Sequence, residues 1–297
     1  MSGKSSIARD ALLVGALALL GACVTLTEDP RALIYEPAGI RAQTLSCPVA
    51  APMARSATTA RDDGGNDGLD PEAIRILTWN IHKEGDAGWD EDLDRYTRSN
   101  DVLLLQEVAL LGSLRDILRR AGLSWVMASS FIYGSIDHGV LTATRTPPVA
   151  TCTQRFVEPL LQIPKSAIIT WLPLKGTKRT LAVANVHAIN FSLSLGTYQA
   201  QLAALADALA EHDGPVVLGG DLNTWTKARA EVVRQVADRL NLVEITYAED
   251  GRTLFLGNQV DHLLVRGLDV VASRTMAVKS SDHNPVEVLL RVARQPD

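Results

Sequence analysis

Short apolar runs rich in branched residues recur along the chain, and they predict the strands of a buried core. Glycine, proline, asparagine or charged residues bound them, as expected where a buried strand reaches solvent. The runs cover residues 73–80, 101–107, 138–145, 166–174, 179–187, 214–223, 261–267 and 284–292.

Three further segments have the period of an amphipathic helix, and they span residues 113–122, 196–212 and 227–241. In the second, apolar residues recur at spacings of four, three and four and form one stripe: Tyr198, Leu202, Leu205 and Leu209. The strands outnumber what one central parallel sheet usually holds, and several follow one another without a helix between them. An α/β fold of two packed mixed sheets with helices outside is therefore predicted.

The N-terminus has the layout of an export signal. Lys4 and Arg9 precede the apolar run of residues 11–20, which is too short to cross a bilayer, where about 20 apolar residues are needed. The ending "LGAC" resembles a bacterial lipobox, and residues 1–23 are predicted to be a lipoprotein-type signal peptide with Cys23 as the lipidated residue. An ordinary cleaved signal peptide and an uncleaved anchor are the alternatives. The expected location is periplasmic, on the outer rather than the inner membrane.

Residues 24–72 show neither helical nor strand period and end in "ARDDGGNDGLDP". They are predicted to be a tether whose first part can pack on the following domain, residues 73–297. Two more cysteines, Cys47 and Cys152, can form a disulfide in an oxidising periplasm, or remain two buried thiols. The sequence does not decide between these states.

The charge of the chain weakens one class of function. Its formal net charge is −5, and no run of Lys and Arg is present, so a strong non-specific grip on nucleic acid is not indicated. With 297 residues, 46% of them hydrophobic, the chain has ample material for a buried core.

Polar residues lie at the ends or the beginnings of several predicted strands. Asn80, Glu107, His187 and Asp221 each close a predicted strand or come next to its end. Asp261 and the pair Asp282–His283 come where strands begin, and they can join the same crevice only if those strands run antiparallel to the others. Strand ends that open onto one crevice are a usual place for a ligand site.

The residue types point to phosphate chemistry with a hard metal ion. Asn80, Glu107 and Asp282 offer oxygen ligands that suit Mg²⁺, with Mn²⁺ as a second possibility. Asp221 and Asn223, two apart in extended backbone, would point the same way and orient a water beside a phosphoryl oxygen. His187 and His283 can donate to phosphate or move a proton, and Asp261 can orient one of them.

Each of these signals is weak alone. A strand-end asparagine is more often a turn residue than a ligand, "GDLN" can be a turn or a helix N-cap, and a lone histidine such as His187 is usually a core residue. Their order along the chain carries more weight than any single residue.

The motifs "TWNIH", "LLLQEV", "NVHAIN", "GGDLNTW", "VDHLLVRG" and "SSDHNPV" occur in the order found in the endonuclease/exonuclease/phosphatase (DNase I-like) superfamily. The chain resembles this superfamily from about Ile74 to Val292, and within it the bacterial YafD-type branch. The resemblance implies a four-layered α/β sandwich and a phosphoesterase that uses a divalent metal to hydrolyse a phosphodiester or phosphomonoester by attack of water.

The resemblance also implies roles for residues. Asn80 and Glu107 would hold the metal with Asp282 near it, and Asp221 would activate the water beside Asn223. His283, backed by Asp261, would contact the phosphate, and His187 would be the second histidine of the site. Asn190 and Lys165 are candidates for substrate binding, although a solvated surface position is an equal expectation for Lys165.

Two questions about function stay open, and the three Asp-His pairs of the sequence differ in their expected roles. A catalytically idle, lipid-anchored binding module of the same fold is the alternative to an enzyme. The substrate can be a nucleic acid, a phospholipid headgroup or a small phosphodiester, and a monomer is expected. Of the three Asp-His pairs, only Asp282–His283 is predicted to place both residues in the site. His262, which follows Asp261, would be structural, and His138, which follows Asp137, would be a loop residue.

Overall fold

The computed structural model describes residues 24–27, 29–36, 39–47, 68–192 and 194–294. Its larger sheet has the strand order β16-β17-β4-β5-β7-β6-β2-β3, and β1 pairs with β6. The strands are β1 (Val24–Thr25), β2 (Arg31–Glu36), β3 (Gly39–Thr44), β4 (Ile74–Asn80), β5 (Val102–Ala109), β6 (Ser124–Tyr133), β7 (Ile136–Thr144), β16 (Leu268–Thr275) and β17 (Val286–Val292).

The second sheet has the order β12-β15-β11-β10-β9-β8, and β13 and β14 form a separate hairpin. These strands are β8 (Ala150–Val157), β9 (Pro164–Pro173), β10 (Thr180–His187), β11 (Val216–Asp221), β12 (Val243–Glu244), β13 (Leu254–Phe255), β14 (Asn258–Gln259) and β15 (Asp261–Arg266). Both large sheets contain parallel and antiparallel pairs, which confirms the prediction of mixed sheets.

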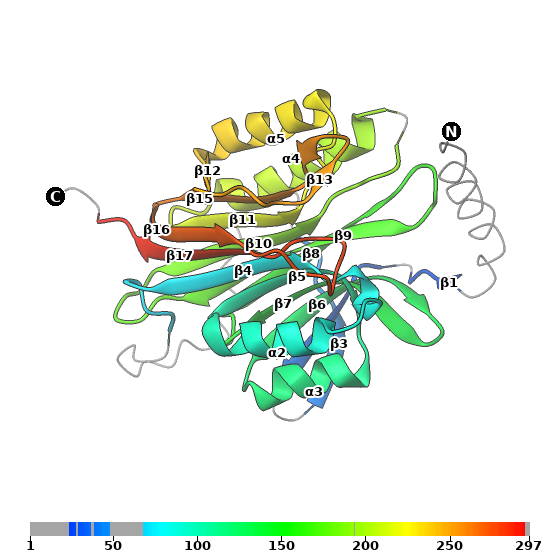
Figure 1. The fold of residues 1–297 in the computed structure, drawn as a ribbon, viewed down its shortest axis with the longest axis horizontal. Helices are drawn as coiled ribbons and strands as arrows, with labels where there is room; N and C mark the ends of the chain where they lie inside the picture. Colours follow the sequence, from blue (N-terminus) through cyan, green and yellow to red (C-terminus); the bar gives the residue numbers. More distant parts are fainter. Residues whose placement is uncertain (1–23, 28, 37–38, 48–67, 193, 295–297) are drawn as a thin grey trace, which may run out of the picture.

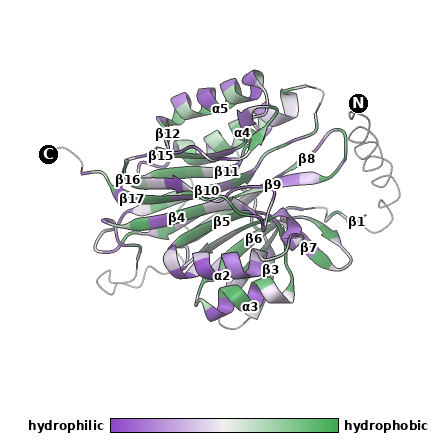
Figure 2. Cartoon of the chain, viewed as in Figure 1, coloured by the Kyte–Doolittle hydropathy of each residue, from purple (hydrophilic) through white to green (hydrophobic). Residues whose placement is uncertain are grey.

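Helices cover the outer face of each sheet and complete four layers (Figure 1). Helices α2 (Trp89–Ser99) and α3 (Gly112–Arg120) lie on the larger sheet, and α4 (Gly196–Ala210) and α5 (Lys227–Leu240) on the smaller one. Figure 2 shows apolar residues concentrated on the strands and polar residues on the outer sides of the helices. One apolar cluster lies between the sheets and includes Ile76, Leu104, Val183, Val217 and Val288.

The N-terminal segment differs from its prediction. Residues 24–47 are not a tether: β2 pairs with β6 and β3 pairs with β2, so that this segment extends the larger sheet. It packs on the domain, as the prediction allowed for its first part. The signal segment with Cys23, and residues 48–67 of the proposed tether, lie outside the described residues.

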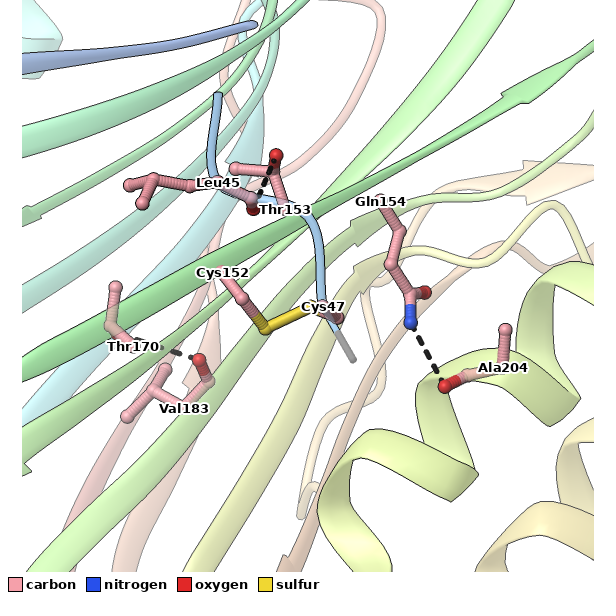
Figure 3. Close-up of a disulfide and its surroundings, with 8 residues drawn as sticks. All are labelled: Leu45, Cys47, Cys152, Thr153, Gln154, Thr170, Val183 and Ala204. Carbon is pink, nitrogen blue, oxygen red and sulfur yellow. Dashed lines mark hydrogen bonds between the residues drawn. A yellow bond between two sulfur atoms is a disulfide. The ribbon is translucent and has the colours of Figure 1, made fainter. Parts of the chain in front are cut away.

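Cys47 and Cys152 form a disulfide, which settles the alternative left open by the sequence (Figure 3). Thr153 lies beside it, and its N–H and hydroxyl both donate to the Leu45 carbonyl, at 2.5 Å and 3.0 Å. Cys152 is buried in the core under α4 and α5. The bond therefore ties the end of the N-terminal segment to the edge strand β8 of the other sheet.

A buried polar network joins the two sheets beneath their strand ends. The Gln106 side-chain amide on β5 donates to Asn185 Oδ1 on β10 at 2.8 Å, and Asn185 Nδ2 donates to the Leu141 carbonyl at 3.0 Å. Both side chains are fully buried. Because an unpaired amide costs about 1–3 kcal/mol in an apolar core, these bonds help to fix one sheet against the other.

Within the part of the chain that the structure describes, no helix combines the length and apolar character needed to cross a membrane.

Candidate active site

The predicted site residues meet where strand ends of the two sheets face each other. β4 runs parallel to β5, and β10 runs parallel to β11 with His187 opposite Asp221. β15 is antiparallel to β11 and places Asp261 opposite Asp221. β17 is antiparallel to β4, so the loop that carries His283 returns to the same end. The opposite strand directions inferred from the sequence are therefore present.

Asp221 lies at the centre of the group and is buried. Its Oδ2 accepts a hydrogen bond from Asn80 Nδ2 at 3.1 Å and lies 3.4 Å from His187 Nε2. Burial raises the pKa of Asp221 to about 6; Asp261 adds to the shift, and His283 opposes it. The carboxylate is therefore a stronger base than an ordinary aspartate, yet it is still ionised at neutral pH.

Asn223 corrects one step of the sequence analysis. Its backbone is left-handed, with φ 50°, rather than extended, so Asp221 and Asn223 do not alternate as on a strand. The Asn223 N–H donates to Asp221 Oδ1 at 3.0 Å, and its side-chain amide donates to the Ala188 carbonyl at 3.0 Å. The segment "GDLN" is thus a turn that holds Asp221 in place and lies within the site.

Glu107 forms the second centre, at a bulge in β5 where its own φ is 52°. Three cationic or basic groups surround its carboxylate: Lys83 contacts it, and Lys165 Nζ and His187 Nε2 each lie 3.7 Å from Oε1. Burial raises the pKa of Glu107, but Lys165, His187 and Lys83 outweigh it and hold the pKa well below its usual value. Glu107 is therefore an anion throughout the neutral range.

Lys165 belongs to this cluster, and the expectation of a solvated surface position is wrong. Its side chain is only 16% exposed, and Nζ lies 3.0 Å from His187 Nε2. Burial and the nearby Lys165 charge hold the pKa of His187 well below its usual value. His187 is thus a neutral imidazole whose Nε2 accepts from the ammonium group of Lys165, which leaves the proton on Nδ1.

His283 is paired with Asp261 behind it, as the sequence analysis expected of these two residues. His283 Nδ1 lies 2.9 Å and 3.0 Å from the two Asp261 oxygens, and the Trp79 indole donates to the His283 carbonyl at 3.0 Å. Burial lowers the pKa of His283, but the charge and hydrogen bond of Asp261, with Asp221 and Asp282, raise it to about 10. His283 is therefore protonated at neutral pH and can donate through Nε2.

Asp282 lies at the edge of the group. Its side chain is 59% exposed, and its Oδ1 lies 3.8 Å from Nδ1 of His82. Its role near a metal stays a prediction.

Asn80 and Glu107 fit an open site for a hard cation. Among the described residues, no group of three or more His, Cys, Asp or Glu side chains is arranged so that it could hold a metal ion by itself. Mg²⁺ does not need such a group, because it is usually held by one or two protein oxygens together with waters and substrate phosphates. The anionic Glu107 carboxylate, which is 18% exposed, could supply one such oxygen, and Asn80 Oδ1, which accepts from the His82 N–H at 3.1 Å, another.

Lys83 is a residue of the site that the sequence analysis missed. It lies in the short turn η2 (His82–Glu84), where three consecutive residues have φ of 46°, 60° and 55°. Both carboxylate oxygens of Glu84 accept from the Ala109 N–H, at 2.9 Å and 3.1 Å, which fastens the turn to β5. This left-handed turn directs the Lys83 ammonium group onto Glu107. Its position directly after "TWNIH" was the signal available in the sequence.

Arg229 on α5 positions the loop that follows β10. It is buried between the rings of Tyr198 and Trp225, with its Cζ 4.5 Å and 4.7 Å from their centres. Its guanidinium group donates to the carbonyls of Ile189 at 2.5 Å and Asn190 at 2.6 Å. The Asn190 side chain accepts from the Trp225 indole at 2.9 Å, so Asn190 is held in a fixed orientation beside the site.

The other two Asp-His pairs contribute less. His262 faces away from Asp261 and bridges Thr224 at 2.5 Å and Glu244 at 2.7 Å, in agreement with a structural role. His138 is not a loop residue, since it lies within β7 and its ring stacks on Phe131 with centres 4.9 Å apart.

Comparison with known proteins identifies the family and the fold. Residues 77–283 match the model of the Endonuclease/Exonuclease/phosphatase family. An endonuclease/exonuclease/phosphatase from Bacteroides vulgatus superimposes with a TM-score of 0.60 at 16% identity, over 74% of this chain and 99% of that chain.

Two solved structures with named activities or ligands share the fold. The human Nocturnin catalytic domain with bound sulfate gives a TM-score of 0.59 at 19% identity, over 76% of this chain and 96% of that chain. ANGEL2, a 2',3'-cyclic phosphatase, gives a TM-score of 0.56 at 13% identity, over 75% of this chain and 96% of that chain. At these identities the likeness shows the fold, whereas the family match spans more than half of the chain. The chain therefore belongs to the endonuclease/exonuclease/phosphatase family.

Proposed function

We propose that this protein is a divalent-metal-dependent phosphoesterase that hydrolyses a phosphodiester or phosphomonoester by attack of water. The observation that carries the proposal is the buried Asp221 carboxylate, fixed by Asn80 and the Asn223 N–H, within reach of both histidine systems. Hydrolysis of a phosphate ester requires a base, a protonated hydrogen-bond donor and fixed positive charges close to one another.

Each side chain has a defined task in this reaction. Asp221 orients the attacking water and accepts its proton. His283, kept protonated by Asp261, donates to a phosphoryl oxygen as negative charge grows there. Lys165 and Lys83 both lie beside Glu107 and would offset its charge and that of the phosphate. His187, neutral, can donate from Nδ1 or receive a proton. A divalent cation bound at Glu107 and Asn80 would polarise a phosphoryl oxygen.

The experiment that tests the proposal is an assay of the purified protein on bis(p-nitrophenyl) phosphate with Mg²⁺ or Mn²⁺. We expect turnover that EDTA removes and that added metal restores. Four further substrates would be compared under the same conditions: a 2',3'-cyclic nucleotide, plasmid DNA, a single-stranded oligonucleotide and phospholipid vesicles. The cyclic nucleotide is chosen because ANGEL2 is a 2',3'-cyclic phosphatase. Absence of metal-dependent turnover on all of them would favour the idle binding module instead.

The Asp261–His283 pair predicts the alkaline side of the pH profile. Because the pKa of His283 is raised to about 10, the protonated form persists, and activity with it, as pH rises to that value. In Asp261→Asn the charge is lost while burial still lowers the pKa, so activity should fall at a distinctly lower pH. The measurement is kcat/KM against pH for both proteins. An unchanged alkaline limb would show that His283 does not act as the protonated donor.

A further inference from the structure

The end of the molecule that carries the site also exposes large apolar side chains. Val157 ends β8 and Leu160 and Leu161 lie in the turn after it, Phe191 follows β10, and Leu254 and Phe255 form β13, with Leu256 in the turn before β14. These residues, here called the apolar rim, are each between 38% and 71% exposed. Where exposed apolar side chains gather at one end of a molecule, they can mark a surface that meets a partner or a membrane.

Contacts tie the parts of the rim to one another and to the site. The Phe255 ring meets the Trp225 ring edge to face, with centres 6.3 Å apart, and the Trp225 indole donates to Asn190. The buried carboxylate of Glu158 accepts from the N–H groups of both Asn190 and Phe191 at 2.7 Å. The rim is thus held by hydrogen bonds around the loop that carries a candidate substrate-binding residue.

Strand register places the rim beyond the carboxyl ends of the site strands. Val157 pairs with Pro164, so the β8–β9 turn projects past the end of β10, where Ala167 pairs with Val186. Ala109 pairs with His138, so the β6–β7 turn projects past the end of β5. Both hairpins extend to the right in Figure 1, on the same side as β1.

The first described residues of the chain lie at this same end. Val24, which directly follows Cys23 in the sequence, pairs with Tyr133 at the tip of β6. Two residues after β1, the hydroxyl of Thr27 accepts from Arg155 of β8 at 2.8 Å. A lipid on Cys23 would therefore enter the bilayer beside the hairpins, with no flexible spacer before the first strand.

We propose that the apolar rim docks on the lipid bilayer that carries the Cys23 anchor and turns the mouth of the site toward the phosphate groups of membrane lipids. The inference rests on the proposed phosphoesterase function for its substrate class, a headgroup phosphate ester. The rim side chains are apolar rather than basic, so a bilayer suits this surface better than a nucleic acid, whose phosphates would call for Lys and Arg.

The docking is tested with the full-length chain reconstituted in phosphatidylethanolamine and phosphatidylglycerol vesicles that contain brominated acyl chains. Leu160→Cys and Leu256→Cys are each labelled with a polarity-sensitive fluorophore, and the unsubstituted chain sets the background. Val271→Cys on the edge strand β16 is the matched control, because Val271 is 52% exposed and Leu160 is 51% exposed. We expect a blue shift and bromine quenching at Leu160→Cys and Leu256→Cys, with neither at Val271→Cys.

Equal signals at all three positions, or none at the rim, would overturn the docking. Protection of the rim labels by a single-stranded oligonucleotide and not by vesicles would assign the surface to nucleic acid and overturn the docking as well.

In a second measurement, Leu160→Asp and Leu256→Asp should each lower the ratio of turnover on vesicle phospholipid to turnover on bis(p-nitrophenyl) phosphate about tenfold. An unchanged ratio contradicts the headgroup substrate. Quenching at the rim without turnover of any phosphate ester would instead refute the proposed function and leave the docking surface intact.

Discussion

Asp221→Asn is expected to lower kcat by about 10²–10⁴-fold, because it removes the base that accepts the proton of the attacking water. The substitution keeps the shape of the side chain and the hydrogen bond from the Asn223 N–H to Oδ1, although an amide nitrogen in place of Oδ2 loses the bond from Asn80. It also replaces a buried carboxylate that burial makes costly to ionise. The folded state should therefore survive, and the loss should appear in kcat rather than in thermal stability.

Asp238→Asn on α5 is the matched control, since Asp238 is exposed and pairs only with Arg234 among the described contacts of its side chain. It should leave turnover and melting temperature near those of the unsubstituted protein. Both variants would be compared by initial rates on bis(p-nitrophenyl) phosphate and by thermal unfolding. Turnover of Asp221→Asn close to that of the control would remove Asp221 from the mechanism.

Loss of the Cys47–Cys152 disulfide is expected to destabilise the protein by about 4–5 kcal/mol, because the bond closes a long loop in the unfolded chain. The two cysteines are 105 residues apart. For a domain of this size, such a change lowers the melting temperature by roughly 10–15 °C. The measurement is thermal unfolding of the double variant Cys47→Ala/Cys152→Ala, and of the unsubstituted protein with and without dithiothreitol.

Dithiothreitol should not change the melting temperature of the double variant, which controls for other effects of the reductant. A shift of only a degree or two on reduction would mean that the pairing of β2 with β6, and of β3 with β2, holds the N-terminal segment without the bond.

The sequence predicted much of the buried part of the fold because burial leaves a pattern, although the buried strand β6 was not predicted. The strands whose side chains are buried, such as β5, β10 and β11, appeared as continuous apolar runs. β3 is almost wholly exposed and lies at a sheet edge, so its residues carry no alternation, and it was taken for part of a tether. Helix α2 has its apolar residues at Trp89, Leu93 and Tyr96 within an acidic segment, and this sparse stripe was overlooked.

The candidate site was predictable where a residue lies at a strand end, and less so where the backbone turns. Asn80, His187 and Asp221 were placed from strand boundaries alone. The left-handed backbone of Asn223 and the direction of Lys83 depend on local turns that the sequence does not specify. Whether Cys47 approaches Cys152 depends on how the two sheets pack, which no spacing along the chain reveals.

The turn at His82–Glu84 affects which substitutions the chain can accept without losing stability or activity. Three residues with side chains hold left-handed backbone, where an L-residue costs roughly 1–2 kcal/mol and glycine costs almost nothing. Lys83→Gly should therefore relax the turn while it removes the ammonium group from Glu107. Stability and catalysis pull in opposite directions at this position. A search for thermostable variants should select glycine at position 83, whereas a search for activity should return lysine.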